Sequence, residues 1–404
     1  MENTFSDRIA DVPKSFIREI LKVTIDNSII SFAGGLPNRQ FFPVKGLQKA
    51  ANDVFEEAGS EILQYANSEG YLGLRQFIAD HYRKLDGLDI SVEDILITTG
   101  SQQGLDLLGK IFLNAGDDLI IEEPGYLGAI QAFSLYRPCF HPVPVSEGGM
   151  DTVTLAQVLR KQHPKLLYTV TNFQNPSGIS YTDENRRAVA QLIRDRSCLI
   201  IQDDPYGDLR FTGKREISFK RLLPENTVLL GSFSKTVAPA LRIGWLVAHP
   251  QIMEKVIVAK QAADLHTDYL SQRILYRFLR DNDIDAHIAT IVRQYGKQKE
   301  VMVDAIKEFF PAEARFTNPD GGMFLWVTLP DGLSSLRLFE TAIAKKVAFV
   351  PGTPFYVDRQ DSNTLRLNFS CSDEPTIVEG IKRLGASIRE VAEIKTDAPR
   401  RYRK

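Results

Sequence analysis

The middle of the chain alternates short apolar runs with segments of helical periodicity. Between the runs, apolar residues recur three and four positions apart, as in amphipathic helices. Strands that alternate with helices in this way predict βαβ units and a mainly parallel sheet. The expected strands are Ile95–Thr98, Leu119–Ile121, Leu166–Val170, Leu199–Ile201, Val228–Leu230 and Trp245–Val247, and the expected helices are Gln102–Leu113, Leu127–Leu135, Leu155–Gln162 and Glu184–Arg194.

After Pro250 the helical pattern continues to about Phe310, and a second, smaller set of strands and helices follows. Its expected elements are strands at Gly321–Val327 and Thr364–Phe369 and helices at Leu336–Lys345 and Pro375–Val391. A chain of 404 residues exceeds the size of one hydrophobic core, so two lobes are expected. We predict an arm with one short helix (Ser15–Val23) at 1–42 that belongs to the small lobe, a large lobe at 43–300 and a small α+β lobe at 301–404.

Composition and charge are those of an ordinary soluble protein, with 43% hydrophobic and 25% charged residues and a net charge of −2. This balance argues against a nucleic-acid or membrane partner. The three cysteines, Cys139, Cys198 and Cys371, are too far apart for a metal pair or a disulfide framework. The polar N-terminus resembles no secretory signal. We therefore expect a cytoplasmic protein without a metal site.

The first candidate for a catalytic or ligand-binding segment follows the apolar run Thr227–Leu230. Two serines, Ser232 and Ser234, precede Lys235, and Arg242 follows. A partly desolvated lysine amine condenses with carbonyl groups, whereas hydroxyls and a guanidinium suit a phosphate. Pyridoxal phosphate carries both an aldehyde and a phosphate. The alternative is that these are plain solvated charges, as most of the 49 Lys and Arg residues must be.

The ends of the other strands carry groups that suit the same ligand, because in open α/β sheets ligands bind beyond the carboxyl ends of the strands. Ser101 starts a helix whose N-terminus would hold a phosphate, or it is a simple cap. Asn175 lies in an Asn-Pro-Ser-Gly turn, and its amide would donate to a phenolate oxygen. Asp203 and Asp204 follow a buried strand and need a partner, either a protonated pyridine nitrogen or a metal ion. No histidine or further acid lies at ligand spacing, which favours the pyridine.

Together these segments resemble the class I/II pyridoxal-phosphate aminotransferases of fold type I. The resemblance covers nearly the whole chain and rests on Asn175-Pro176-Ser177-Gly178, Asp203-Asp204-Pro205-Tyr206 and Ser232-Phe233-Ser234-Lys235 with Arg242. Similarity to the 2-aminoadipate and kynurenine aminotransferase branch rests on Ser31–Pro37, Thr99–Gln103, Gln261–Thr267 and Asn363–Leu367. The resemblance implies an α/β large domain with a mainly parallel seven-stranded sheet sandwiched by helices. One departure is Ala240, where the family usually has glycine, and it puts the local backbone conformation in question.

The resemblance also implies roles for individual residues. Lys235 would be the catalytic residue that forms the Schiff base and then moves the substrate Cα proton. Asp203 would pair with the ring nitrogen. The other cofactor residues would be Tyr206 and Asn175 at the ring oxygen, Tyr126 stacked on the ring, and Ser101, Gln102, Ser232, Ser234 and Arg242 at the phosphate. Tyr65 matches a tyrosine that reaches the neighbouring subunit's phosphate, which implies a homodimer.

Substrate recognition is expected at Arg366, which matches the arginine that grips the substrate α-carboxylate, with Asn175 and Gly35 beside it. Arg18 resembles an arginine on a mobile N-terminal helix that binds a distal carboxylate, or else it lies on a helix face in water. We expect 2-aminoadipate, glutamate, aromatic or branched-chain amino acids as donors and 2-oxoglutarate as an acceptor. Two alternatives remain: another fold-type-I enzyme such as a β-lyase or a decarboxylating enzyme, and a non-catalytic regulator.

Overall fold

The structure is a computed structural model that describes residues 4–10, 26 and 28–397. The predicted helix Ser15–Val23 lies outside the described residues, and so does Arg18. Within the described part of the chain, none of the helices combines the length and the apolar character needed to cross a bilayer.

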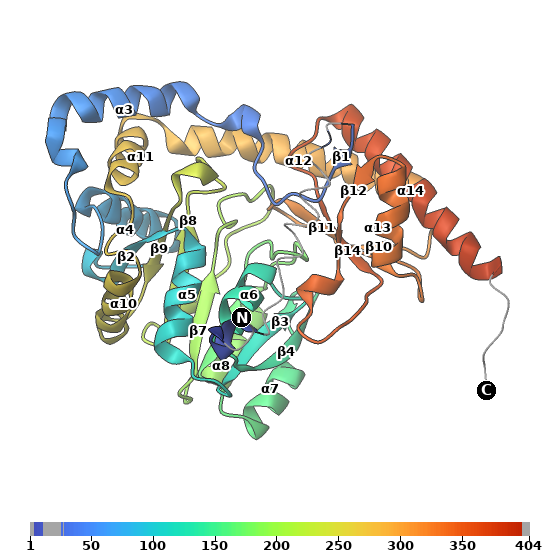
Figure 1. The fold of residues 1–404 in the computed structure, drawn as a ribbon, viewed down its shortest axis with the longest axis horizontal. Coiled ribbons are helices and arrows are strands. Elements are labelled where there is room, and N and C mark those ends of the chain that lie inside the picture. The colour runs from blue at the N-terminus through green and yellow to red at the C-terminus, as the bar shows by residue number, and fades with distance from the viewer. Residues whose placement is uncertain (1–3, 11–25, 27, 398–404) are drawn as a thin grey trace.

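An eight-stranded sheet forms the large lobe, in the order β2-β9-β8-β7-β6-β3-β4-β5 (Figure 1). Strands β8, β7, β6, β3 and β4 run parallel, and β9 is antiparallel to both of its neighbours. The mainly parallel sheet is thereby confirmed, and the two-residue β5 extends it beyond the expected seven strands. The strands are β2 (Ile95–Thr99), β3 (Asp118–Glu123), β4 (Cys139–Ser146), β5 (Gly149–Met150), β6 (Leu166–Thr169), β7 (Leu199–Asp203), β8 (Thr227–Ser232) and β9 (Ile243–Val247).

Helices cover both faces of this sheet, which explains why its central strands are continuous apolar runs. Successive residues of β6 belong to different cores: Leu166 packs in one cluster with α5 and α6, and Leu167 packs in another with α7 and α8. The Thr182 hydroxyl caps α8 by accepting a hydrogen bond from the Asn185 N–H. These helices are α5 (Ser101–Phe112), α6 (Leu127–Ser134), α7 (Thr152–Lys161), α8 (Asp183–Ile193) and α10 (Pro250–Ala263).

Besides the two-residue β5, the hydrophobic pattern misses strand β4 of this sheet. Pro142 and Pro144 interrupt its apolar run, and they align with Ile121 and Glu123 of β3. Proline cannot donate to a neighbouring strand, so it is tolerated at the edge of a sheet. Only the two-residue β5 pairs with the outer side of β4.

The small lobe holds an antiparallel sheet in the order β10-β11-β14-β13. In the arm, β1 (Ile30–Ser31) pairs with β12 (Val347–Ala348) of this lobe. Helix α12 (Ile284–Phe309) runs from the large lobe to the small lobe and contains the predicted boundary at residue 300 (Figure 1). The remaining elements of this lobe are β10 (Arg315–Phe316), β11 (Phe324–Thr328), β13 (Val350–Pro351), β14 (Thr364–Asn368), α13 (Ser335–Ala344) and α14 (Glu374–Asp397).

Three more helices form the end of the molecule opposite α13 and α14 (Figure 1). They are α3 (Val44–Ala58), α4 (Leu72–Asp86) and α11 (Tyr269–Asp281). Together with β2 and β9 they enclose a separate apolar cluster that includes Leu74, Ile78 and Leu275.

Candidate functional site

A cavity of about 380 Å³ lies at the carboxyl ends of the parallel strands, where loops of the large lobe meet β14 of the small lobe. This is the position at which open α/β sheets bind ligands. Its lining residues are Gly35, Leu36, Ser101, Gln102, Tyr126, Val170, Asn175, Asp203, Pro205, Tyr206, Ser232, Ser234, Lys235, Arg242 and Arg366.

Nearly all residues predicted for the site therefore meet in one cavity, although they come from positions far apart in the sequence. Among the described residues the exception is Tyr65. Arg18 lies outside the described residues. Tyr65 is 80% exposed on the surface and contacts the His266 ring edge-on, with 5.9 Å between the ring centroids. In the single chain, Tyr65 does not reach this cavity.

Asp203 is buried at the end of β7. Its Oδ2 accepts a hydrogen bond of 2.9 Å from the Tyr168 hydroxyl. Its Oδ1 is buried and has no hydrogen-bond partner among the described residues. Burial raises the pKa of Asp203 to about 7. A buried carboxylate oxygen without a donor is a site for a positively charged hydrogen-bonding group.

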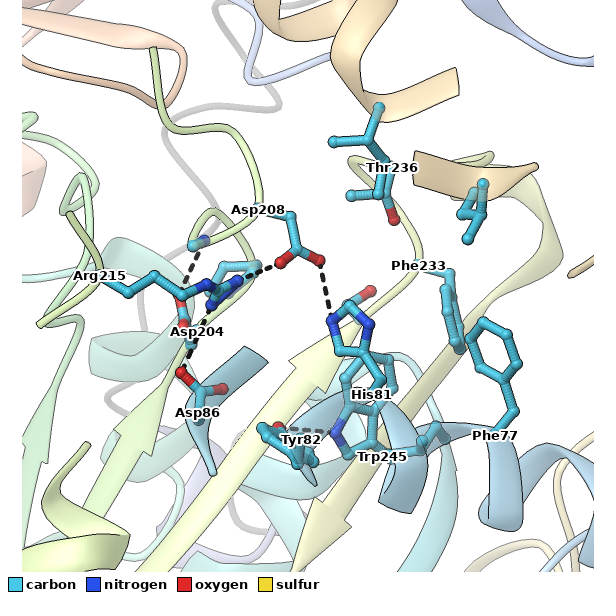
Figure 2. Close-up of a pocket in the computed structure, with 16 residues that line it drawn as sticks. Phe77, His81, Tyr82, Asp86, Asp204, Asp208, Arg215, Phe233, Thr236 and Trp245 are labelled. Atoms are coloured by element: carbon cyan, nitrogen blue, oxygen red, sulfur yellow. Dashed lines mark hydrogen bonds and ion pairs between the residues drawn. The ribbon is translucent and has the colours of Figure 1, made fainter. Parts of the chain in front are cut away.

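The neighbouring Asp204 points to the opposite face of the sheet, because successive side chains of an extended chain alternate. It accepts hydrogen bonds of 2.7 Å from the Asn172 amide and 2.8 Å from the Gly207 N–H. Figure 2 shows it in a second cavity, near Asp86 and Arg215. Of the two adjacent acids, only Asp203 is thus available to a ligand in the first cavity.

Lys235 follows β8, and its Nζ donates a hydrogen bond of 2.7 Å to the carbonyl oxygen of Gly35. No carboxylate of a described residue lies within ion-pair distance of this amine. Burial, together with the positive charge of Arg366, lowers the pKa of Lys235 to about 8. An amine with this pKa is partly unprotonated near neutral pH and is suited to nucleophilic attack and to proton transfer.

Hydroxyl groups and one guanidinium gather at another wall of the cavity. Ser101 is the first residue of the twelve-residue helix α5, so free backbone N–H groups point towards this wall. The Ser232 hydroxyl donates to that of Ser234 over 2.8 Å. Arg242 lines the same cavity. Such a set suits a phosphate or another anion.

Two residues with positive φ, Gly100 and Arg242, set the backbone conformation beside the proposed anion site. Gly100 has a φ of +72°, and a Cβ at this position would collide with the Arg242 guanidinium. Arg242 itself has a φ of +54° after the short 3₁₀ turn η5 (Pro239–Leu241). Ala240 lies inside this turn and is not among the residues with positive φ. The alanine found where the family usually has glycine is therefore accommodated without backbone strain.

Arg366 on β14 is buried, and no acid of the described residues pairs with it. Its Nη1 donates over 2.8 Å to Asn175 Oδ1, and its Nη2 donates over 2.7 Å to the Ala33 carbonyl oxygen. Its Nε is buried without a partner among the described residues. Burial lowers the pKa of Arg366 to about 10. A buried guanidinium without a counter-ion is a binding site for an anionic group.

Asn175 connects Arg366 to the phenol of Tyr206, to which its Nδ2 donates over 3.4 Å. The Asn175–Pro176 peptide is cis. Tyr206 packs edge-on against Phe324, with 5.8 Å between the ring centroids. Tyr126 lies at the N-terminus of α6, and burial raises its pKa to about 12. Both phenols are therefore neutral hydrogen-bonding groups in the absence of a ligand.

Sequence reasoning missed several residues of this site. Leu36, Val170 and Pro205 line the cavity, and apolar residues beside a motif carry no distinctive signal. Tyr168 was missed as well, although a signal exists: it is a phenol within an otherwise aliphatic buried strand, and a buried tyrosine hydroxyl needs a partner.

Comparison with known proteins places this cavity in context. Residues 31–384 match the family model of aminotransferase class I and II. The chain is 41% identical over 382 residues to a 2-aminoadipate transaminase of Thermus thermophilus, covering 94% of each chain. It is 39% identical over 395 residues to aromatic-amino-acid aminotransferase 1 of Thermococcus litoralis, covering 96% of this chain and 95% of the relative.

A solved structure shares the whole architecture. It is the α-aminoadipate aminotransferase of Thermus thermophilus complexed with N-(5'-phosphopyridoxyl)-L-leucine, with a TM-score of 0.91 and 39% identity. The alignment covers 97% of this chain and 99% of the solved chain.

Proposed function

The chain belongs to the class I and II aminotransferases, and we propose that it uses 2-aminoadipate, glutamate, aromatic or branched-chain L-amino acids as donors and a 2-oxo acid such as 2-oxoglutarate as acceptor. It is a transaminase that depends on pyridoxal phosphate. One observation supports the residue assignments below. The Lys235 amine has no carboxylate partner among the described residues, and it shares one cavity with Asp203 and Arg366.

The residues of the cavity fit this cofactor. The unpartnered Oδ1 of Asp203 would accept a hydrogen bond from the protonated ring nitrogen. Tyr206 and Asn175 would bind the phenolic oxygen, and Tyr126 would lie against the ring. The phosphate would be held by the N-terminus of α5 with Ser101 and Gln102, and by Ser232, Ser234 and Arg242.

Bound pyridoxal phosphate supplies an aldehyde that accepts the amino group and a ring that withdraws electrons from the substrate Cα. The chain supplies the rest. Lys235 Nζ would hold the cofactor and then take the proton from the Cα, which its pKa of about 8 allows near neutral pH. Arg366, oriented by Asn175 and beside the backbone of Gly35, would bind the α-carboxylate in a fixed position.

The substrate range is supported by the relatives, which are named for 2-aminoadipate and for aromatic amino acids, and by the leucine adduct in the solved structure. The decisive experiment is a screen of amino donors against 2-oxoglutarate with product analysis. Formation of a keto acid and glutamate would support the proposal. Pyruvate with ammonia, or carbon dioxide, would instead indicate a β-lyase or a decarboxylating enzyme.

We further propose that Arg18 binds the distal carboxylate of dicarboxylic donors. Arg18→Ala should then weaken 2-aminoadipate and glutamate far more than leucine or phenylalanine. The matched control is Arg39→Ala, an exposed arginine of the same arm that does not line the cavity. Equal losses for all donors would refute this specificity role.

A homodimer with shared sites is the third part of the proposal. Near Tyr65 in the sequence, Leu63 is 68% and Leu72 is 57% exposed. Burial of such large apolar side chains in an interface would support a dimer. In a dimer, Tyr65 would reach the phosphate site of the partner subunit and would no longer face water.

Hybrid dimers test the shared site. Lys235→Ala and Tyr65→Ala subunits should each be weakly active alone. After mixing and subunit exchange, one site per hybrid would combine an intact Lys235 with an intact Tyr65 from the partner, so activity should recover. No recovery despite exchange would place Tyr65 in its own subunit's site or outside any site.

We also propose a cytoplasmic location, which the unpaired thiols of Cys139, Cys198 and Cys371 support. Cell fractionation with immunodetection would test it.

A further inference from the structure

We propose that Tyr168 is a positioning residue for Asp203: its hydroxyl holds one carboxylate oxygen so that the other stays ionised and directed at the cofactor's ring nitrogen. This inference deepens the proposed function and rests on it. Tyr168 does not line the cavity and would act only through Asp203.

The sheet register brings the two side chains together. Tyr168 on β6 aligns with Ile201 on β7, and Asp203 lies two residues further along the same strand. Side chains two residues apart share one face of a sheet, and a long side chain reaches its diagonal neighbour. The result is the 2.9 Å hydrogen bond from the Tyr168 hydroxyl to Asp203 Oδ2. Tyr168 is fully buried and packs edge-on against Phe133, which fixes its ring.

Tyr168 is the only side chain among the described residues that donates to Asp203. The other buried acids nearby have separate donors. Asp204 binds Asn172 and Gly207 on the opposite face of the sheet. Asp203 therefore depends on Tyr168 alone to offset the cost of ionisation in a buried position, where desolvation raises its pKa.

A second tyrosine–acid pair lies on the opposite face of the same sheet. The Tyr181 hydroxyl donates over 2.7 Å to Glu122 Oε1, and both residues are buried. Glu122 receives further hydrogen bonds from Thr169, Val170 and Gln174. The pair repeats the chemistry of Tyr168 and Asp203 without a ligand-facing oxygen. It is therefore a matched control.

The test compares Tyr168→Phe with Tyr181→Phe in the full-length protein. Each change removes one buried hydroxyl from a carboxylate, so both should lower the thermal midpoint, and Tyr168→Phe should lower it more because Glu122 keeps three other donors. Only Tyr168→Phe should weaken binding of pyridoxal phosphate, by about ten- to a hundredfold, the effect of one hydrogen bond to a charged group. Binding of the cofactor analogue with carbon in place of the ring nitrogen should change less than about twofold, because this analogue has no nitrogen for Asp203 to bind.

Nitrogen NMR with ¹⁵N-labelled cofactor reads the ring nitrogen directly. Wild type and Tyr181→Phe should show a protonated nitrogen, and in Tyr168→Phe the signal should move towards the unprotonated value. The inference would be overturned if all three proteins bound the cofactor with the same affinity, bound the analogue with the same affinity, and gave the same nitrogen signal. A wild-type protein that forms no adduct at Lys235 would instead refute the proposed function.

Discussion

Two buried lysines, Lys235 and Lys260, show how differently one side chain is used in this fold. Lys260 on α10 has a fully buried side chain, and its Nζ donates to three acceptors. These are Gln103 Oε1, Thr267 Oγ1 and Asp264 Oδ2, each at 2.8 Å. Lys235 has a single acceptor, the Gly35 carbonyl oxygen, and no carboxylate within ion-pair distance among the described residues.

Burial lowers the pKa of both amines; a carboxylate, Asp264, opposes the shift at Lys260, whereas at Lys235 only the Cys371 thiol does. Around Lys235 the neighbouring charges are the cations Arg366 and Arg242, which favour its neutral form. Burial alone therefore does not make a reactive lysine. Reactivity requires burial, no carboxylate, and a cavity that admits the reaction partner.

Of the changes that test this contrast between Lys235 and Lys260, Lys235→Ala should have the largest effect on activity. Amino transfer should fall at least about 1000-fold, because the group that moves the Cα proton is lost. Lys260→Met should retain activity within about tenfold, since Lys260 does not line the cavity. Initial rates at saturating cofactor measure both, and borohydride reduction followed by peptide mapping locates the adduct. An adduct on Lys260, or an undiminished adduct in Lys235→Ala, would reverse the assignment.

The second largest effect should be the contribution of Lys235 to the pH dependence of the unfolding free energy. In the cofactor-free enzyme the pKa of Lys235 is about 8, below its usual 10.5. Between these values the unfolded chain binds a proton that the folded chain lacks, so raising the pH stabilises the fold. The difference in unfolding free energy between wild type and Lys235→Met should shift in favour of wild type by about 1–3 kcal/mol from pH 8 to 10.5. Urea denaturation across this range measures it, and a flat difference would mean that Lys235 is not desolvated.

A smaller effect is expected from a change at Asp264, the carboxylate that pairs with Lys260 and has no counterpart beside Lys235 among the described residues. Asp264→Asn leaves the buried Lys260 charge with neutral partners and should lower the unfolding free energy by about 2 kcal/mol. Combined with Lys260→Met, the loss should be less than the sum of the single losses, because no unpaired charge remains. Strict additivity in the double-mutant cycle would show that the two side chains are not coupled.

The smallest effect should come from an exposed lysine. Lys49 pairs with Asp53 over 2.7 Å, and its side chain is 73% exposed. Such surface pairs contribute little, so Lys49→Met should change activity by less than about twofold and leave the urea midpoint nearly unchanged. A large loss would mean that this part of α3 is covered in the assembled enzyme.

The hydrophobic pattern predicted the central strands well because a strand covered on both faces must be apolar throughout. It missed β4, whose Pro142 and Pro144 break the run but are tolerated at the edge of the sheet. The polar groups after the strands were identified as one site because parallel strands end at the same edge. Their hydrogen-bond partners were not, since Tyr168 and Asp203 are joined only by the register of β6 against β7.

The sequence by itself determined the family, the two-lobed α/β class and the residue types that meet a phosphopyridine. These follow from local periodicity and from motifs that are contiguous in the chain. Only the tertiary structure decided that Asp203 rather than Asp204 faces the cavity. It also decided that, within the described part of the chain, neither Arg366 nor Lys235 pairs with a carboxylate, whereas Lys260 does. Those outcomes depend on which side chains from distant segments approach within hydrogen-bond distance, and no single segment encodes that proximity.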